Sequence, residues 1–303
     1  MPMADSQKVA SCQWDRHEAT FCQRRIGTGS PHASRTIAGV AAPDVPGPVA
    51  PRDAATVVLL RDGRDGVEAY TLRRQRTMAF ASGMYVFPGG RVDPRDSRHE
   101  VAWAGPSPAE FADRFATSEP LARALVCAAV RETFEESGVL LAGADAGELA
   151  ADTGGHDWEA DRQALVDRAL AFSDMLARRA LVLRADLLRA WARWITPEIE
   201  PMRYDTRFFV AALPTGQRTR DVGGEADRVE WVRPAEALER WSHGEMRMLP
   251  PTVTTFGEMS RYASVEAVLA AAGDRRIEPI RPKAVLEDGT VRLVLPGERG
   301  YGA

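Results

Sequence analysis

The chain has 303 residues, of which 45% are hydrophobic and 27% are charged, a composition typical of a globular protein. Its formal net charge of −4 and sequence pI near 5.8 argue against nucleic-acid binding through a basic surface. No apolar run approaches the roughly 18 residues that a membrane-spanning helix needs. We therefore expect neither a nucleic-acid partner nor a membrane partner.

The N-terminal region and the cysteines bear on localisation. The three cysteines, Cys12, Cys22 and Cys127, form no CxxC pair, so we expect neither a disulfide scaffold nor a zinc site. A reducing cytoplasm is the simplest compartment, because the first 25 residues also lack the apolar core of a signal peptide. Residues 1–50 are rich in Ser, Gly, Pro and scattered charge, which predicts a disordered leader; an overextended start codon explains them equally well.

Ordered structure is predicted to begin with a β-branched strand at residues 55–60, paired as a hairpin with an alternating strand at 67–72. A short strand follows within 83–90 and runs into a turn at Gly89-Gly90. Residues 91–117 are polar and interrupted by prolines, which predicts an inserted loop with a helix near 108–115. The segment Ser118-Glu119-Pro120 then predicts the start of a helix that ends at Ser137.

The second half of the chain alternates between the two types of element. We expect a strand at 139–141, helical structure within 158–194, strands at 207–213 and 228–232, and a helix from Pro234 to Trp241. A helix at 265–272 and two strands around Asp288-Gly289 follow. This order predicts an α/β fold with a mixed sheet between helices, a main domain over 51–255 and a C-terminal extension over 256–303 that caps the sheet or forms a homodimer contact.

The chemically informative segment runs from Arg131 to Val139 and reads Arg-Glu-Thr-Phe-Glu-Glu-Ser-Gly-Val. On a helix Glu132 lies beside Glu135 and Glu136, because residues three and four apart share a face. Three carboxylates within one turn repel one another, and a hard divalent cation such as Mg²⁺ would neutralise them. The alternative is a solvated acidic face, but the preceding Gly89-Gly90 turn and the following Gly138 favour a built loop–helix–loop site.

These residues resemble the Nudix hydrolases, whose motif has the form G-x5-E-x7-R-E-U-x-E-E-x-G-U, with U a bulky aliphatic residue. The resemblance covers roughly residues 53–255 and implies a Nudix fold and a Mg²⁺-dependent hydrolase, with Mn²⁺ as a substitute ion. By position it implies Glu135 and Glu136 as metal ligands, with Glu132 and the backbone carbonyl of Gly90 assisting. Arg131 belongs to the same catalytic set.

The first half of the motif departs from that pattern. Gly90 and Arg131 are 131 − 90 = 41 residues apart where the family has 14, and the early Glu of the motif is replaced by Arg123. Glu119 lies about one turn earlier and is a substitute candidate, although an acid in the first turn of a helix has a sufficient structural role.

The interrupted motif resembles the Nudix subgroup that includes the animal peroxisomal coenzyme A diphosphatase. The segments 191–197 and 205–210 are similar to that subgroup too, and Arg74 and Gly83 match its coenzyme A signature, whereas Ala79 replaces a second arginine. The resemblance implies a small-molecule nucleoside diphosphate substrate, coenzyme A or acyl-coenzyme A, bound by Arg73, Arg74, Phe87 and Gly89. Arg76 could add charge at the same strand end, or these arginines could simply be solvated.

The expected reaction is in-line attack of water on one phosphorus of the diphosphate, assisted by Mg²⁺ and arginine. Glu225 is the candidate general base by its resemblance to a late acidic residue of the family, and an exposed loop acid is the alternative. Other nucleoside diphosphate derivatives, such as ADP-ribose or a dinucleotide, remain open as substrates. A Nudix-fold ligand sensor without turnover is the competing function class, which the intact Glu135–Glu136 pair argues against.

Overall fold

The computed structural model describes residues 49–77, 81–97, 100–223, 226–287 and 290–301. The predicted leader, apart from its last two residues, lies outside this range, as do Ala79 and Glu225. Two compact units are distinguished: residues 48–281 contain the sheet and the helices, and residues 282–303 belong to a separate unit.

The main unit is built on a mixed sheet whose strands run in the order β10-β2-β1-β9-β8-β11. β1 pairs antiparallel with β2 and β4 and parallel with β9, and β3 adds to β2. The predicted hairpin and mixed sheet are therefore confirmed. The strands of this sheet are β1 (Arg52–Gly63), β2 (Gly66–Arg74), β3 (Tyr85–Val86), β4 (Gly89–Arg91), β8 (Arg189–Ile195), β9 (Tyr204–Ala212), β10 (Ala226–Val232) and β11 (Pro279–Ile280).

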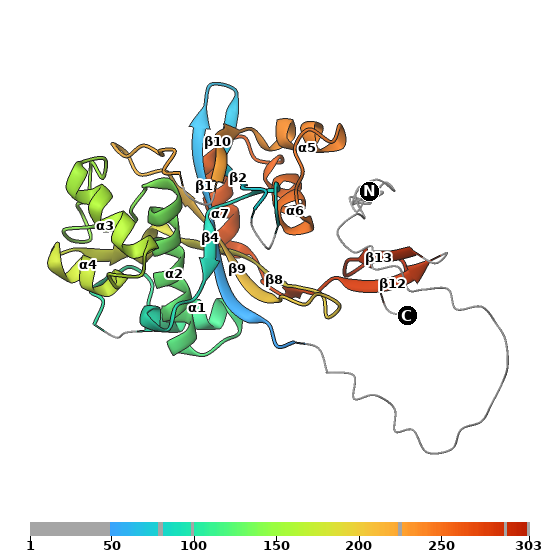
Figure 1. Ribbon diagram of the computed structural model, residues 1–303, viewed down its shortest axis with the longest axis horizontal. Coiled ribbons are helices and arrows are strands. Elements are labelled where there is room, and N and C mark those ends of the chain that lie inside the picture. The colour runs from blue at the N-terminus through green and yellow to red at the C-terminus, as the bar shows by residue number, and fades with distance from the viewer. Residues whose placement is uncertain (1–48, 78–80, 98–99, 224–225, 288–289, 302–303) are drawn as a thin grey trace, which may run out of the picture. The chain divides into compact units, whose positions relative to one another are not determined.

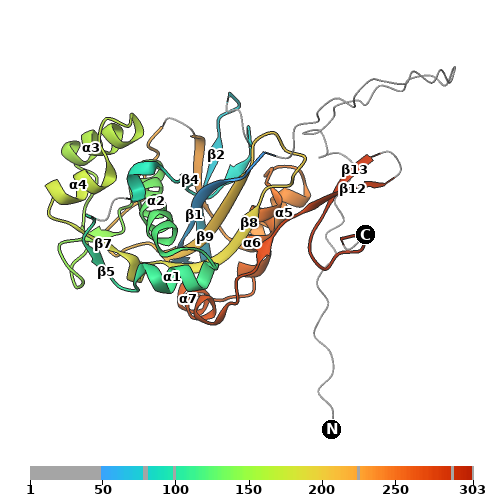
Figure 2. The same cartoon turned by 90° about the horizontal axis from the view of Figure 1, so that it is seen from below.

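Helices lie on both sides of this sheet, as Figure 1 shows with α2 to its left and α5 and α6 to its right, and as the turned view in Figure 2 repeats. The α-helices are α1 (Pro108–Phe115), α2 (Glu119–Ser137), α3 (His156–Val166), α4 (Phe172–Arg178), α5 (Pro234–Ser242), α6 (Pro250–Met259) and α7 (Val265–Asp274). Two 3-10 turns, η2 (Pro94–Ser97) and η3 (Ala185–Leu187), and a small sheet of β5 (Trp103–Ala104), β6 (Ala142–Gly143) and β7 (Val182–Arg184) complete the unit.

α2 is the central helix of the fold. Its side chains Leu125 and Phe134 are fully buried in one cluster with Val57 of β1 and Phe209 of β9. Ser118 takes the N-cap position with extended backbone, and Gly138 ends the helix in the left-handed conformation at φ 73°. Both predicted boundaries are confirmed, although the Ser118 side chain makes no capping hydrogen bond.

Two predicted elements differ from the structure. Residues 139–141 are not a strand, which begins only at Ala142; Leu140 is instead held by the side chain of Gln217, which bonds its backbone N–H and C=O. The helical structure predicted through residue 194 is wrong after α4, where the strands β7 and β8 replace it. β8 is buried on both faces and has a register shift between Ala190 and Ala192, so its apolar residues mimic helical spacing.

The unit of residues 282–303 contains the hairpin of β12 (Lys283–Glu287) and β13 (Thr290–Val294), as predicted. Within the described residues, no helix has the length and apolar character needed to span a bilayer.

Candidate active site

The glycine turn lies against β1 and faces α2. Gly89 pairs with Thr56 and Gly90 with Ala55, and a Cβ on Gly89 would come within 2.5 Å of the Ala55 carbonyl oxygen. A Cβ on Gly90 would lie 2.5 Å from the Glu132 carboxyl carbon. Only glycine permits both approaches, so the turn brings bare backbone up to the carboxylates of the helix.

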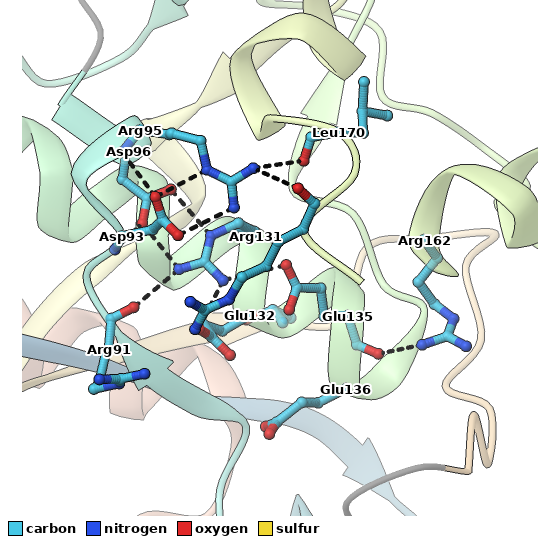
Figure 3. A network of polar contacts seen from close by, with 12 residues as sticks. Arg91, Asp93, Arg95, Asp96, Arg131, Glu132, Glu135, Glu136, Arg162 and Leu170 are labelled. Carbon is cyan, nitrogen blue, oxygen red and sulfur yellow. Dashed lines mark hydrogen bonds and ion pairs between the residues drawn. The ribbon is translucent and has the colours of Figure 1, made fainter. Parts of the chain in front are cut away.

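Three glutamates and one arginine form the core of the site (Figure 3). The Nη1 group of Arg131 donates to Glu132 Oε1 at 2.7 Å and to Glu135 Oε1 at 3.2 Å. Glu136 points away from Arg131 and accepts a 2.8 Å hydrogen bond from the backbone N–H of Gly89. The structure thus brings together Arg131, the three glutamates and the glycine turn.

Asp96 completes this network, and sequence reasoning missed it. Its two carboxylate oxygens accept from Nε and Nη2 of Arg131 at 3.0 and 2.9 Å, a bidentate pair, and its side chain is only 2% exposed. Asp96 belongs to η2 inside the 91–117 insertion. The insertion therefore supplies the residue that orients Arg131, and no spacing rule linked it to the helix.

Burial dominates the electrostatics of the cluster. The side chains of Glu132 and Glu135 are each 13% exposed, and the loss of water raises the pKa of both carboxyl groups although Arg131 opposes that rise. One guanidinium shared among Glu132, Glu135 and Asp96 leaves the cluster short of positive charge. Such a site favours a further cation.

A second layer positions the end of α2. Arg162 of α3 donates to the backbone carbonyl of Glu135 at 2.8 Å, and its own charge is paired with Glu159. A Cβ at Gly138 would lie 2.6 Å from Nε of Arg220, so this glycine allows a side chain from the 213–223 loop to pack on the helix end. The helix terminus is therefore fixed from two sides.

Tyr70 of β2 lies close to the same region. Its hydroxyl donates to the Arg220 carbonyl at 3.1 Å, and its pKa is raised by burial first and then by the charges of Asp221 and Glu136. The charges of Asp221, from the 213–223 loop, and of Glu136 thus both act on Tyr70.

The predicted substrate-binding residues lie in different surroundings, and not all of them are in the site. Gly89 lies in the site, whereas Phe87 is 3% exposed and packs on Phe256 of α6 with ring centroids 5.1 Å apart. Arg73 and Arg74 lie at the end of β2, half-buried, with Arg73 paired to Asp227 at 2.6 Å. Glu230 of β10, the strand that pairs with β2, accepts hydrogen bonds from Arg240 at 2.9 and 3.0 Å.

The two positions weighed for the missing early glutamate lie away from the carboxylates. Glu119 is exposed and thirteen residues before Glu132, roughly 20 Å along the helix at 1.5 Å per residue. Arg123 stacks over the Trp103 ring of the insertion, with Cζ 5.1 Å from the ring centroid. Arg123 therefore links the insertion to α2.

The fit of this site to a metal ion rests on its donor chemistry. Three carboxylates and the Gly90 carbonyl are hard oxygen donors of the kind that Mg²⁺ takes. In the part of the chain that the structure describes, no three His, Cys, Asp or Glu side chains are arranged to hold a metal ion. The reason is visible in the hydrogen bonds, since Glu132 and Glu135 turn to Arg131 and Glu136 turns to Gly89.

The chain is similar to several known proteins. The chain is 26% identical to the Xenopus laevis acyl-coenzyme A diphosphatase NUDT19, over 77% of this chain and 71% of that protein. It is 27% identical to the Gallus gallus protein of the same name, over 84% and 75% respectively. The crystal structure of a Nudix hydrolase from Alicyclobacillus acidocaldarius matches with TM-score 0.58 and 29% identity, covering 76% of this chain and 99% of that one.

The family model described as the NUDT19 Nudix domain matches residues 102–261, which is more than half of the chain. That range contains the whole of α2, and the α/β fold with its mixed sheet is the one the matching crystal structure has. The chain therefore belongs to the Nudix hydrolases, in the family of the NUDT19 Nudix domain.

Proposed function

We propose that this enzyme hydrolyses the diphosphate bond of coenzyme A or acyl-coenzyme A in a Mg²⁺-dependent reaction. The observation that carries the proposal is the meeting of the Gly89-Gly90 turn with two carboxylates of α2, those of Glu132 and Glu136. The relatives named acyl-coenzyme A diphosphatases support the substrate class, since this chain matches them over 77% and 84% of its length.

Glu132, Glu135, Glu136 and the Gly90 carbonyl are the proposed holders of the cation. Nudix hydrolases generally use divalent metals. When bound, Mg²⁺ or Mn²⁺ supplies positive charge against the diphosphate oxygens and activates water. The chain's own residues set the geometry: Asp96 holds Arg131, Arg131 keeps Glu132 and Glu135 side by side, and the Gly89 N–H fixes Glu136.

The remaining site residues stay proposals. Arg73 and Arg74 would neutralise substrate phosphates from the end of β2, because guanidinium groups form bidentate contacts with phosphate. Glu225 is the proposed general base and lies outside the described residues. A cytoplasmic location and a homodimer built with the help of residues 256–303 also remain predictions.

The experiment is a substrate panel with the purified enzyme. Coenzyme A, acyl-coenzyme A esters, ADP-ribose and dinucleotides are each incubated with Mg²⁺, and products are separated by chromatography. We expect a phosphopantetheine product from the coenzyme A compounds, no turnover after chelation by EDTA, and recovery when Mg²⁺ is restored. Turnover restricted to ADP-ribose or a dinucleotide would replace the proposed substrate, and tight binding without any turnover would indicate a ligand sensor.

A further inference from the structure

A basic pocket lies at the end of β2, apart from the carboxylates of α2. It has a volume of about 370 Å³ and is lined by Arg73, Arg76, Ser82, Gly83, Tyr85, Gly244, Glu245 and Arg247. The lining joins two segments far apart in the sequence, the chain around β3 and the stretch that connects α5 to α6. Neither Gly244 nor Arg247 belongs to any motif in the sequence.

The connecting stretch is held rigidly against β3. The backbone N–H of Tyr85 donates to the Arg247 carbonyl at 2.8 Å, and Tyr85 forms a bridge with Met248. Met246 and Met248 are buried at 0% and 3% exposure, whereas Arg247 between them is exposed. This alternation directs the Arg247 side chain out of the core, where it lines the pocket.

The charge of the pocket is positive. Arg73 is neutralised by Asp227, and Glu245 adds one negative charge to the wall. In the described part of the chain, neither Arg76 nor Arg247 forms a salt bridge or a side-chain hydrogen bond. Two exposed guanidinium groups beside one hollow are suited to an anion with several acceptor oxygens, of which a phosphate monoester is the common biological case.

The backbone fixes how far this pocket lies from the reaction site. Tyr85 is four residues before Gly89, whose N–H contacts Glu136, so the two backbones are at most roughly 13 Å apart at 3.3 Å per residue. Arg73 is three residues from Tyr70, and the charge of Glu136 is one of the causes that raise the pKa of Tyr70. A substrate whose diphosphate lies at the carboxylates can therefore place a second phosphate here.

We propose that Arg247, with Arg76, binds a phosphate monoester of the substrate remote from the scissile diphosphate, and so selects substrates that carry one. The inference rests on the proposed function for its substrate: coenzyme A carries such a group on its ribose, and dephospho-coenzyme A lacks only that group. Arg247 is thus a specificity residue and takes no part in the bond cleavage.

The test compares kcat/KM for coenzyme A and dephospho-coenzyme A in the wild-type enzyme and in Arg247→Ala, Arg76→Ala and Arg64→Ala. Arg64 is the matched control, because it is an exposed arginine in the β1–β2 turn at the opposite end of β2, roughly 20 Å or more from Arg73. We expect the wild-type enzyme to prefer coenzyme A by about tenfold or more, the worth of one charge-assisted hydrogen bond. Arg247→Ala and Arg76→Ala should each lose most of that preference through KM, with dephospho-coenzyme A turnover unchanged, and Arg64→Ala should keep it.

Equal kcat/KM for the two substrates in the wild-type enzyme, or equal losses on both substrates in Arg247→Ala, would overturn the inference and leave the proposed function standing. If neither compound is hydrolysed, the proposed function fails. Calorimetric measurement of nucleotide binding then tests separately whether the pocket is a phosphate site. Adenosine 3′,5′-bisphosphate should then bind at least about tenfold more tightly than AMP to the wild-type protein and to Arg64→Ala, and without preference to Arg247→Ala. Equal binding of the two nucleotides by the wild-type protein would remove the pocket as a phosphate site.

Discussion

At the residue scale, Arg131 is the most connected side chain of the site. It contacts Asp96, Glu132, Glu135 and the Arg91 carbonyl while remaining 9% exposed. A buried guanidinium with this many acceptors holds carboxylates in place that would otherwise repel one another. The glutamates can therefore stay close together before any cation arrives.

Substitution of Glu136 should reduce activity with little effect on stability, because Glu136 contacts the glycine turn and not Arg131. We expect Glu136→Gln to lower kcat/KM by at least about a hundredfold while the unfolding midpoint stays near that of the wild type. Glu119→Gln, at the exposed start of the same helix, is the control and should keep full activity. A wild-type rate in Glu136→Gln would remove this residue from the proposed metal site.

Asp96 should matter for stability as well as for activity. Asp96→Ala removes both acceptors of the bidentate pair from the buried Arg131 guanidinium, which we expect to cost about 3 kcal/mol in urea unfolding. Glu278→Ala removes an exposed ion pair with Arg276 and should change the free energy of unfolding by less than about 1 kcal/mol. Similar values for the two variants would show that Asp96 does not anchor Arg131.

At the scale of elements, the glycines at helix ends and inside helices have different roles. Gly138 ends α2 at φ 73°, with Arg220 packed where a Cβ would lie, whereas Gly257 lies inside α6 and a Cβ there would meet no atom within 4 Å. Replacing glycine by alanine should therefore destabilise the protein at position 138 and stabilise it at position 257.

We expect Gly138→Ala to destabilise the protein by about 1–2 kcal/mol, through left-handed strain and displacement of Arg220. Gly257→Ala should stabilise it by about 0.5–1 kcal/mol, because alanine is the better helix former. Chemical denaturation of both variants beside the wild type measures the difference. Destabilisation of equal size in both would contradict the assigned role of Gly138.

At the scale of the whole molecule, α6 and α7 are connected to the sheet through Trp191. The indole N–H donates to Glu258 of α6 at 2.9 Å, and Arg275 at the end of α7 lies over the ring, with Cζ 4.0 Å from its centroid. Arg275 also pairs with Glu258 at 2.9 Å. Phe256 and Met259 are fully buried in the same unit.

These contacts lead to a prediction about truncation. A chain that ends after residue 281 should unfold cooperatively at nearly the wild-type midpoint, because it keeps the whole compact unit 48–281. A chain that ends after residue 255, the boundary predicted from sequence, loses buried side chains of α6 and α7 and should fail to fold stably. Thermal unfolding followed by circular dichroism distinguishes the two, and equal stability would support the boundary at 255.

The sequence by itself determined the local elements and the chemistry of the helix. The spacing of Glu132, Glu135 and Glu136 fixes a shared face on any α-helix, and Ser118 and Gly138 mark its ends through backbone preferences that need no tertiary context. For the same reason α1, α2, α5 and α7 were predicted at nearly their observed bounds, whereas β1 extends three residues beyond the predicted strand at each end.

Only the tertiary structure decided how distant segments meet. Asp96 from the insertion binds Arg131, and the Arg123 side chain stacks on Trp103. Arg247 lines the pocket beside Tyr85. These residues are far apart in the sequence, and no local pattern predicts that they meet. β8 was predicted as helix because a strand buried on both faces has no polar alternation to identify it. The three glutamates could therefore be identified from their sequence spacing. The residues that hold them in place, and the pocket beside them, could be identified only from the folded structure.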